Sequence, residues 1–217
     1  MRELDKERSF EGGDYSLTCR VCANHFTGFK SYRVCKACSI ISTTKTIQLK
    51  IRENFFLTIS GAHELKDALQ PDTTHILSFT HPGNSNDVSI EHKANVKKVC
   101  VHDTYLRKQS TMGLTIPSRE LVEEIIDWFL IIKKEWEEGG TVKVICQCQA
   151  GISRSTAMAY VLMVMLSGET SESARNLVKL RDIANPNPLM IKYAEEILNV
   201  NISSALKQMN RLRYTDY

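Results

Sequence analysis

Residues 148–155, Cys-Gln-Ala-Gly-Ile-Ser-Arg-Ser, place a nucleophile, an anion ligand and a hydroxyl group within one short segment. Five residues separate the thiol of Cys148 from the guanidinium of Arg154, and the hydroxyl of Ser155 follows directly. A guanidinium can donate two parallel hydrogen bonds to one oxyanion, and a thiolate beside it can attack the atom that carries those oxygens. The segment therefore predicts covalent chemistry on a tetrahedral oxyanion such as a phosphoryl group.

The flanking residues indicate how this segment is held. Residues 142–146 alternate like the end of a buried strand, and residues 156–166 form an almost unbroken apolar, helix-forming run. A strand, a tight loop and a helix start in succession direct backbone N–H groups at one point, which binds a dianion and favours the thiolate of Cys148. The alternative is an ordinary strand-to-helix turn around a buried structural cysteine.

This segment resembles the Cys-x5-Arg phosphate loop of cysteine-dependent phosphatases, in the Cys-x-Ala-Gly-x-Ser-Arg-Ser form found in dual-specificity and bacterial-type tyrosine phosphatases. Residues 181–188, Arg-Asp-Ile-Ala-Asn-Pro-Asn-Pro, are similar to the Arg…Pro-Asn segment of small phosphatases of this group. The likeness extends over residues 46–200 or so, but only the phosphate loop is highly specific. It implies a phosphatase that forms a phosphocysteine intermediate.

The expected roles follow from that chemistry. Cys148 would attack phosphorus, while Arg154 and the backbone N–H groups of the loop would hold the equatorial oxygens. The predicted phosphate ligands are Gln149, Ala150, Gly151, Ile152, Ser153 and Arg154. By resemblance, Ser155 donates to the Cys148 sulfur and helps the thiolate leave; the alternative is a helix-start serine that bonds only backbone. Catalysis of this kind needs no metal ion.

A general acid must come from another segment, because the phosphate loop contains no carboxylate. Asp103 follows the predicted strand 96–101 and begins the irregular stretch 103–116. Parallel strands bring their carboxyl ends to one edge of a sheet, so Asp103 and Cys148 are expected near each other. Asp103 could instead be a capping or loop aspartate, and Asp87 is an alternative acid.

The two residues before Cys148 are Gln147, which differs from the family pattern, and a second cysteine, Cys146. Small phosphatases commonly have His immediately before the nucleophile, whereas this chain has Gln147, which adds no positive charge. Cys146 lies two positions before Cys148 and could form a reversible link with it under oxidation. Plain core packing is the favoured interpretation of Cys146, because free cysteine behaves as a small hydrophobe.

Two Cys-x2-Cys pairs form a second constellation near the start of the chain. They are Cys19 and Cys22, then Cys35 and Cys38, with twelve residues between the pairs. Four thiolates at this spacing can bind one structural Zn²⁺ and so stabilise a segment too small for its own core. Disulfides, unrelated thiols and ligation by His25 remain alternatives.

The same region is strongly basic. Residues 15–52 contain seven Lys or Arg and no Asp or Glu, although the whole chain has a net charge of only +3. An acidic partner is therefore expected, and the aromatic residues among the cations suit single-stranded nucleic acid. The favoured interpretation of these residues is that Phe26, Phe29 and Tyr32 pack the zinc module while Lys30 and Arg33 are solvated, because so small a module needs its apolar groups for folding.

The alternation of strand and helix patterns predicts an α/β fold with a mainly parallel sheet and helices on both faces, like that of tyrosine phosphatases, plus a small zinc module. Residues 1–42 are expected to form the N-terminal arm and zinc module, and residues 43–217 the phosphatase domain. The predicted strands are 46–50, 55–60, 75–79, 96–101 and 142–146. The predicted helices are 62–69, 118–138, 153–166, 171–181 and 188–206.

Composition indicates the cellular location of the protein but does not identify its substrate. The longest apolar run, residues 157–166, is too short for a membrane span, which needs about 20 residues, and no secretory leader is evident. A cytoplasmic protein is expected, with the nucleus as an alternative. Its substrate would be phosphotyrosine, phosphoserine or phosphothreonine in proteins. The alternatives are an RNA 5′-phosphate, an inositol phosphate, or phosphate binding without turnover.

Overall fold

The chain divides into two compact units, Met1–Lys45 and Thr46–Tyr217. The computed structural model describes residues 15–18, 25–28, 47–82, 92–104 and 113–208. In the first unit, strand β1 (Tyr15–Thr18) pairs antiparallel with β2 (His25–Gly28), and Thr18 lies opposite His25. The sequence between these paired strands, residues 19–24, contains Cys19 and Cys22.

The second unit is built on a five-stranded mixed sheet in the order β3-β4-β7-β5-β6. The strands are β3 (Gln48–Arg52), β4 (Phe55–Gly61), β5 (His75–Thr80), β6 (Asn95–Cys100) and β7 (Val142–Cys148). Only β3 runs antiparallel to its neighbour, so the predicted mainly parallel sheet is confirmed. Strands β4 and β7 are almost entirely buried, as expected of parallel strands covered on both faces.

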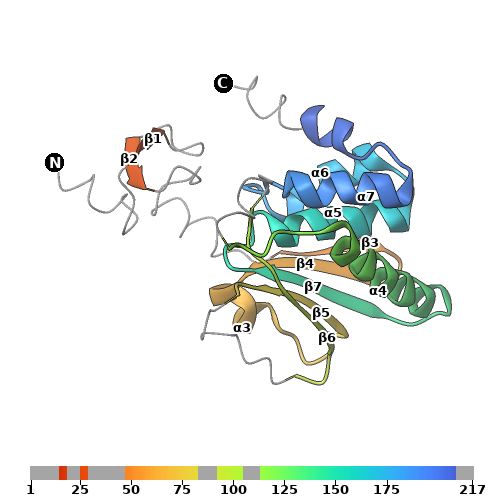
Figure 1. The fold of residues 1–217 in the computed structure, drawn as a ribbon. Helices are drawn as coiled ribbons and strands as arrows, with labels where there is room; N and C mark the ends of the chain where they lie inside the picture. The colour runs from red at the N-terminus through yellow and green to blue at the C-terminus, as the bar shows by residue number, and fades with distance from the viewer. Residues whose placement is uncertain (1–14, 19–24, 29–46, 83–91, 105–112, 209–217) are drawn as a thin grey trace. The chain divides into compact units, whose positions relative to one another are not determined.

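Helices cover both faces of this sheet, as predicted, but unequally (Figure 1). One face carries α4 (Arg119–Glu137), α5 (Arg154–Ser167), α6 (Thr170–Leu180) and α7 (Pro188–Leu198). The other face carries the short pair η1 (Ala62–Glu64) and α3 (Leu65–Ala68). Neighbouring strand residues alternate between them: Ile145 packs with Leu65 of α3, whereas Val144 and Cys146 belong to the larger core.

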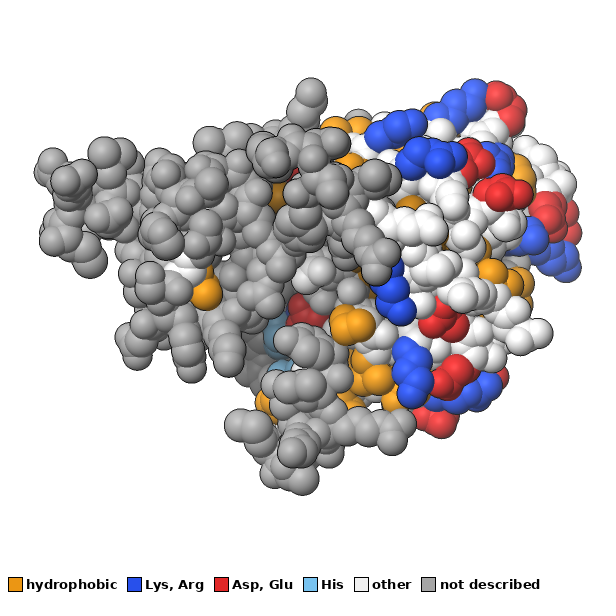
Figure 2. All heavy atoms as spheres, turned by 90° about the horizontal axis from the view of Figure 1, so that it is seen from above, with side chains coloured by type: hydrophobic (Ala, Val, Ile, Leu, Met, Phe, Trp, Pro, Cys, Tyr) orange, Lys and Arg blue, Asp and Glu red, His pale blue; other side chains and the backbone are white. Residues whose placement is uncertain are grey.

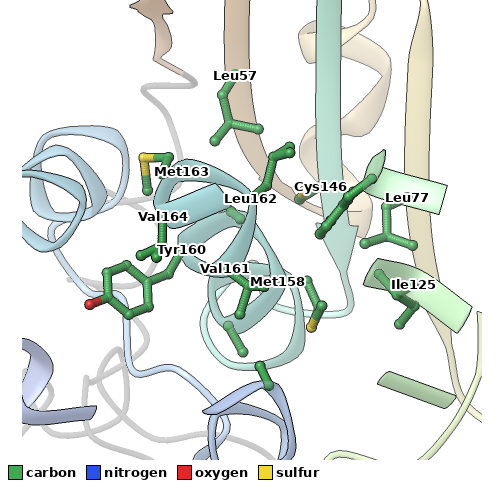
Figure 3. Close-up of a cluster of buried hydrophobic side chains, with 14 of the residues drawn as sticks. Leu57, Leu77, Ile125, Cys146, Met158, Tyr160, Val161, Leu162, Met163 and Val164 are labelled. Carbon is green, nitrogen blue, oxygen red and sulfur yellow. The ribbon is translucent and has the colours of Figure 1, made fainter. Parts of the chain in front are cut away.

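Helix α5 is the centre of the larger core. Its side chains from Arg154 to Val164 are all buried, which explains why this helix is apolar all round after its first turn. Figure 3 shows Met158, Val161 and Leu162 of α5 among side chains that come from the sheet and from α4. The Tyr160 hydroxyl donates to the carbonyls of Thr170 and Ile202, and burial raises the pKa of this phenol.

The helix boundaries follow the capping residues. Ser118 accepts a hydrogen bond from the Leu121 N–H at the start of α4, and Gly168, with φ of 73°, ends α5. One prediction was too long: α7 ends at Leu198, Asn199 adopts φ of 52°, and residues 203–208 form a separate helical turn. Asn and its short side chain tolerate this left-handed conformation, which the amphipathic pattern alone does not reveal.

The described surface is mixed in charge. Figure 2 shows basic and acidic side chains next to one another on one face of the molecule. The pairs Arg119–Glu123, Lys133–Glu137 and Lys192–Glu196 join residues one helical turn apart. Within the described ranges, no helix is both long and apolar enough to cross a membrane.

Candidate active site

The candidate site lies where strand β7 ends and helix α5 begins. Cys148 is the last residue of β7, residues 149–153 form the turn, and Arg154 is the first residue of α5. Cys148 is buried, and its Sγ lies 3.1 Å from the Oγ of Ser155, which is also buried. The strand-loop-helix arrangement predicted for this segment is therefore present, with the thiol at the base of the turn.

Every carbonyl of this turn accepts a hydrogen bond from a donor outside it. The Gln149 carbonyl accepts from the Ala62 N–H (3.1 Å), that of Ile152 from the Asn185 N–H (2.8 Å), and that of Ser153 from the Ala157 N–H (2.9 Å). The carbonyls of Ala150 and Gly151 accept from Arg181 Nη2 (3.0 Å) and Nε (3.1 Å). The carbonyls point outward, and none of the N–H groups of residues 149–154 donates to another described residue.

A buried ion pair supplies two of these donors. Arg181 and Glu64 are 2% and 4% exposed, and Arg181 Nη1 lies 3.1 Å from Glu64 Oε1. The second oxygen of Glu64 accepts from the Gly61 N–H at 2.6 Å. Glu64 thus compensates the charge of Arg181 and fixes the end of β4 against the turn. The sequence identified Arg181 only by family resemblance and gave no signal for Glu64.

Gly151 is required by two independent constraints. Its φ of 67° lies in the left-handed region that side chains disfavour. A Cβ at this position would lie 2.8 Å from the Gly61 nitrogen and 2.9 Å from Arg181 Nη2. Only glycine therefore lets the turn approach both the end of β4 and the guanidinium that holds it.

Arg154 is 1% exposed and its guanidinium is only partly used by the protein. Nη1 donates to the carbonyls of Val101 (2.7 Å) and Thr80 (3.1 Å), which lie at the ends of β6 and β5. Nη2 lies 3.1 Å from Nε2 of His81, whereas the buried Nε has no partner among the described residues. A buried, unpaired N–H of a charged group beside Cys148 fits a site for an anion.

Asp103 lies against the same turn, as the edge of the parallel sheet predicts. Its Oδ1 accepts from Ser153 Oγ at 2.6 Å and from Asn187 Nδ2 at 3.0 Å. Asn187 is buried, and its own Oδ1 caps α7 through the Leu189 and Met190 N–H groups. Oδ1 of Asp103 is therefore occupied by two donors, whereas no described side chain donates to Oδ2.

The two residues before Cys148 face the protein interior. Gln147 Oε1 accepts from Ser78 Oγ at 2.6 Å, which links β7 to β5. Cys146 is fully buried in the core, and burial, followed by the neighbouring Cys148, raises the pKa of its thiol. A thiol in that environment stays protonated and packs as an apolar group.

Several predicted residues lie outside the described part of the chain. They are the zinc ligands Cys19, Cys22, Cys35 and Cys38, the alternative acid Asp87, and Phe29, Lys30, Tyr32 and Arg33. Within the described residues, no cluster of three or more His, Cys, Asp or Glu side chains could hold a metal ion. The zinc prediction is therefore carried by the cysteine spacing.

No protein-family model and no curated protein matches the sequence. Solved structures do match the fold. The crystal structure of DUSP15 is 21% identical, covers 76% of this chain and 95% of its own, and has a TM-score of 0.51. The human tyrosine phosphatase-like serine/threonine/tyrosine-interacting protein is 18% identical, covers 71% of this chain and 97% of its own, and also has a TM-score of 0.51. The second unit of this chain thus has the fold of dual-specificity and tyrosine phosphatases.

The buried ion pair gives a first prediction. Glu64→Gln should lower the free energy of unfolding by about 3–5 kcal/mol, because it leaves the buried charge of Arg181 uncompensated. Urea denaturation followed by circular dichroism measures this change. Glu53→Gln, which removes an exposed partner of Lys50, serves as the control and should change stability little. An equally small loss from both variants would contradict a structural role for the Glu64–Arg181 pair.

Proposed function

We propose that the protein is a cysteine-dependent phosphatase of the dual-specificity and tyrosine type, which hydrolyses phosphate monoesters through a phosphocysteine intermediate. One observation carries the proposal. Around the thiol of Cys148, the backbone N–H groups of residues 149–154 and the Nε–H of Arg154 have no described protein acceptor. A tetrahedral dianion would accept from these donors while its phosphorus lies against the sulfur.

In the first step, the Cys148 thiolate attacks phosphorus and forms an S–P bond as the P–O bond to the leaving group breaks. The leaving oxygen takes a proton from Asp103, through the Oδ2 that its other contacts leave unoccupied. Arg154 and the loop N–H groups stabilise the charge on the three equatorial oxygens. The phosphocysteine and the free alcohol or phenol are the products of this step.

In the second step, water attacks the phosphocysteine. The Asp103 carboxylate accepts a proton from that water, the S–P bond breaks, and inorganic phosphate and the thiolate form. The Ser155 hydroxyl, 3.1 Å from the sulfur, is suited to donate to the departing thiolate. Atoms and charges balance without a metal ion or a cofactor.

Fold by itself does not establish turnover, because one of the similar structures is described as a phosphatase-like interacting protein. The second candidate is accordingly a module that binds phosphorylated groups without hydrolysing them. The contact between Cys148 and Ser155 and the placement of Asp103 beside the turn favour hydrolysis, since binding alone needs neither. Trapping of a phosphocysteine distinguishes the two candidates.

A phosphorylated protein is the proposed substrate, ahead of an RNA 5′-phosphate or an inositol phosphate. The non-protein alternatives depend on the basic stretch of residues 15–52 for recruitment. Its two described cations are engaged elsewhere: Lys50 pairs with Glu53 at 2.6 Å and Arg52 with Glu172 at 3.3 Å. These contacts reduce the positive charge that the described part of the stretch offers to a polyanion.

A structural zinc ion in the first unit is a second, independent proposal. It is supported by the pairing of β1 with β2, because the chain between these strands contains one Cys-x2-Cys pair. Cys19 and Cys22 would supply two of the four thiolates of a tetrahedral zinc site, and Cys35 with Cys38 would complete it. The zinc would stabilise this unit and would take no part in the phosphatase chemistry.

The zinc proposal predicts about one zinc per chain in metal-free buffer, measured by elemental analysis of the purified protein. Cys19→Ser should lower this content substantially, because three thiolates bind zinc more weakly than four. The control is Cys100→Ser, which removes the exposed cysteine of β6 and should leave the metal content unchanged. Equal zinc in all three proteins, or none in the wild type, would contradict the proposal.

Cys148→Ser tests the nucleophile. Hydrolysis of p-nitrophenyl phosphate, measured with a chelator present, should fall by more than about 1,000-fold because a hydroxyl is a far weaker nucleophile than a thiolate. The control is Cys100→Ser, because Cys100 is exposed, whereas a change at the buried Cys146 would also disturb the core. Retained turnover in Cys148→Ser would overturn the mechanism, and no turnover in the folded wild type would favour the phosphate-binding module.

Asp103→Asn tests the acid by the dependence of rate on the leaving group. A phosphoserine peptide, whose alkoxide leaves poorly, should be hydrolysed about 100- to 10,000-fold more slowly, and p-nitrophenyl phosphate should be affected much less. Asp127→Asn on the exposed side of α4 is the matched control and should change neither rate. Equal slowing of both substrates by Asp103→Asn would identify a different acid.

A further inference from the structure

His81 follows strand β5 and contacts the candidate site at the guanidinium of Arg154. Its Nε2 lies 3.1 Å from Nη2 of Arg154, and its ring packs edge-on against His102 with 5.7 Å between the centroids. Sequence reasoning found no role for this residue, because it lies outside the phosphate loop and 73 positions from Arg154. Among the described contacts, it meets the predicted phosphate ligands only at that guanidinium.

The protein uses only some of the N–H donors of the Arg154 guanidinium. A guanidinium has five N–H donors and no acceptor, so any atom bonded to it must accept. The two hydrogens of Nη1 are used by the carbonyls of Val101 and Thr80, and one hydrogen of Nη2 is used by His81. The Nε–H and the second Nη2–H remain, and these are the two donors available to a pair of phosphoryl oxygens.

The contact requires a neutral imidazole, because Nε2 accepts only when it carries no proton. Among the described residues, the charged and titratable groups that face the ring are Arg154 from α5 and His102 and Asp103 from the segment after β6. Burial lowers the pKa of His81, Arg154 and His102 lower it further, and Asp103 opposes them. The net shift is downward, which keeps Nε2 available as an acceptor near neutral pH.

Three acceptors on two nitrogens determine the plane of the guanidinium. The carbonyls of Val101 and Thr80 hold Nη1 alone, so the rest of the group could rotate about that nitrogen. His81 supplies the contact on Nη2 that prevents this rotation. We propose that His81 is a positioning residue for the proposed phosphatase reaction, whose neutral Nε2 directs the Nε–H and the remaining Nη2–H of Arg154 toward the phosphoryl oxygens.

The proposal rests on the proposed function, and a binding measurement separates the two. Sulfate stays a dianion near neutral pH, and its affinity for the intact Cys148→Ser protein reports on the anion site without any turnover. His81→Leu in that background should weaken sulfate binding about 10- to 100-fold, because it removes a hydrogen bond to a charged group. His81→Gln should retain affinity within a few-fold of the parent, because its amide oxygen can replace Nε2 as the acceptor.

A matched control separates positioning from the general effect of a nearby imidazole. His63 lies at the rim of the turn with a 62% exposed side chain and has no hydrogen bond to Arg154 among the described contacts. His63→Leu should change sulfate affinity less than about twofold, a screened surface effect. The melting temperature of each variant, measured in sulfate-free buffer, identifies any variant that is merely misfolded.

The decisive comparison uses Arg154→Lys. If His81 acts through the guanidinium, His81→Leu should weaken sulfate binding about 10-fold or more when Arg154 is intact, but less than about twofold in the Arg154→Lys background. Non-additivity of this kind is typical of direct partners. Additive losses, or equal affinities for His81→Leu and His81→Gln, would overturn the positioning role. In the otherwise wild-type enzyme, His81→Leu should lower kcat/KM for p-nitrophenyl phosphate by a similar factor.

Failure of the phosphatase proposal and failure of the positioning role of His81 would give different experimental results. Absence of Cys148-dependent turnover with normal sulfate binding would refute the phosphatase proposal, while the sulfate measurements would still decide the role of His81. Normal turnover with unchanged sulfate binding in His81→Leu would refute the positioning role and leave the phosphatase proposal intact. A folded Cys148→Ser protein that binds no sulfate, together with no Cys148-dependent turnover in the wild type, would refute both.

Discussion

The orientation of five consecutive peptide groups is the constraint on which the rest of the site depends. Residues 149–153 turn their carbonyls outward, and each carbonyl accepts from a donor outside the turn. Without those donors, a loop with parallel peptide dipoles would be left with unpaired acceptors on one side and clustered N–H groups on the other. The donors that bind the outward carbonyls therefore stabilise a turn whose N–H groups cluster on its other side before any anion binds.

The topology of the sheet explains how those donors come together. Because β4, β5, β6 and β7 are parallel, their carboxyl ends meet at one edge. The end of β4 contributes the Ala62 N–H and the helical turn with Glu64, and the ends of β5 and β6 contribute the carbonyls that hold Arg154. The chain after α6 returns to the same edge, where Arg181 and Asn187 bind the turn and Asp103. Segments distant in sequence thus contact one loop.

The sequence predicted the parts of the site that are local. The strand, turn and helix around Cys148 have a composition and spacing that few other structures allow, and the position of Asp103 follows from strand direction. His81 and Glu64 were not predictable, because a histidine or glutamate acquires its role only from the residue it faces across the fold. Burial reverses the usual expectation for such residues: Glu64 is 4% exposed although glutamate is ordinarily a surface residue.

These contacts also concentrate the electrostatics of the site on one side chain. Arg181 is compensated by Glu64, and Gln147, where small phosphatases commonly have histidine, is neutral and bonded to Ser78. The downward pKa shift of His81 favours its neutral form as well. Within the described residues near Cys148, Arg154 is then the cation that an oxyanion would meet, together with the N-terminus of α5. An anion site that depends on a single guanidinium needs that group held in one orientation, and the two carbonyls and the imidazole around Arg154 contact it at two of its nitrogens.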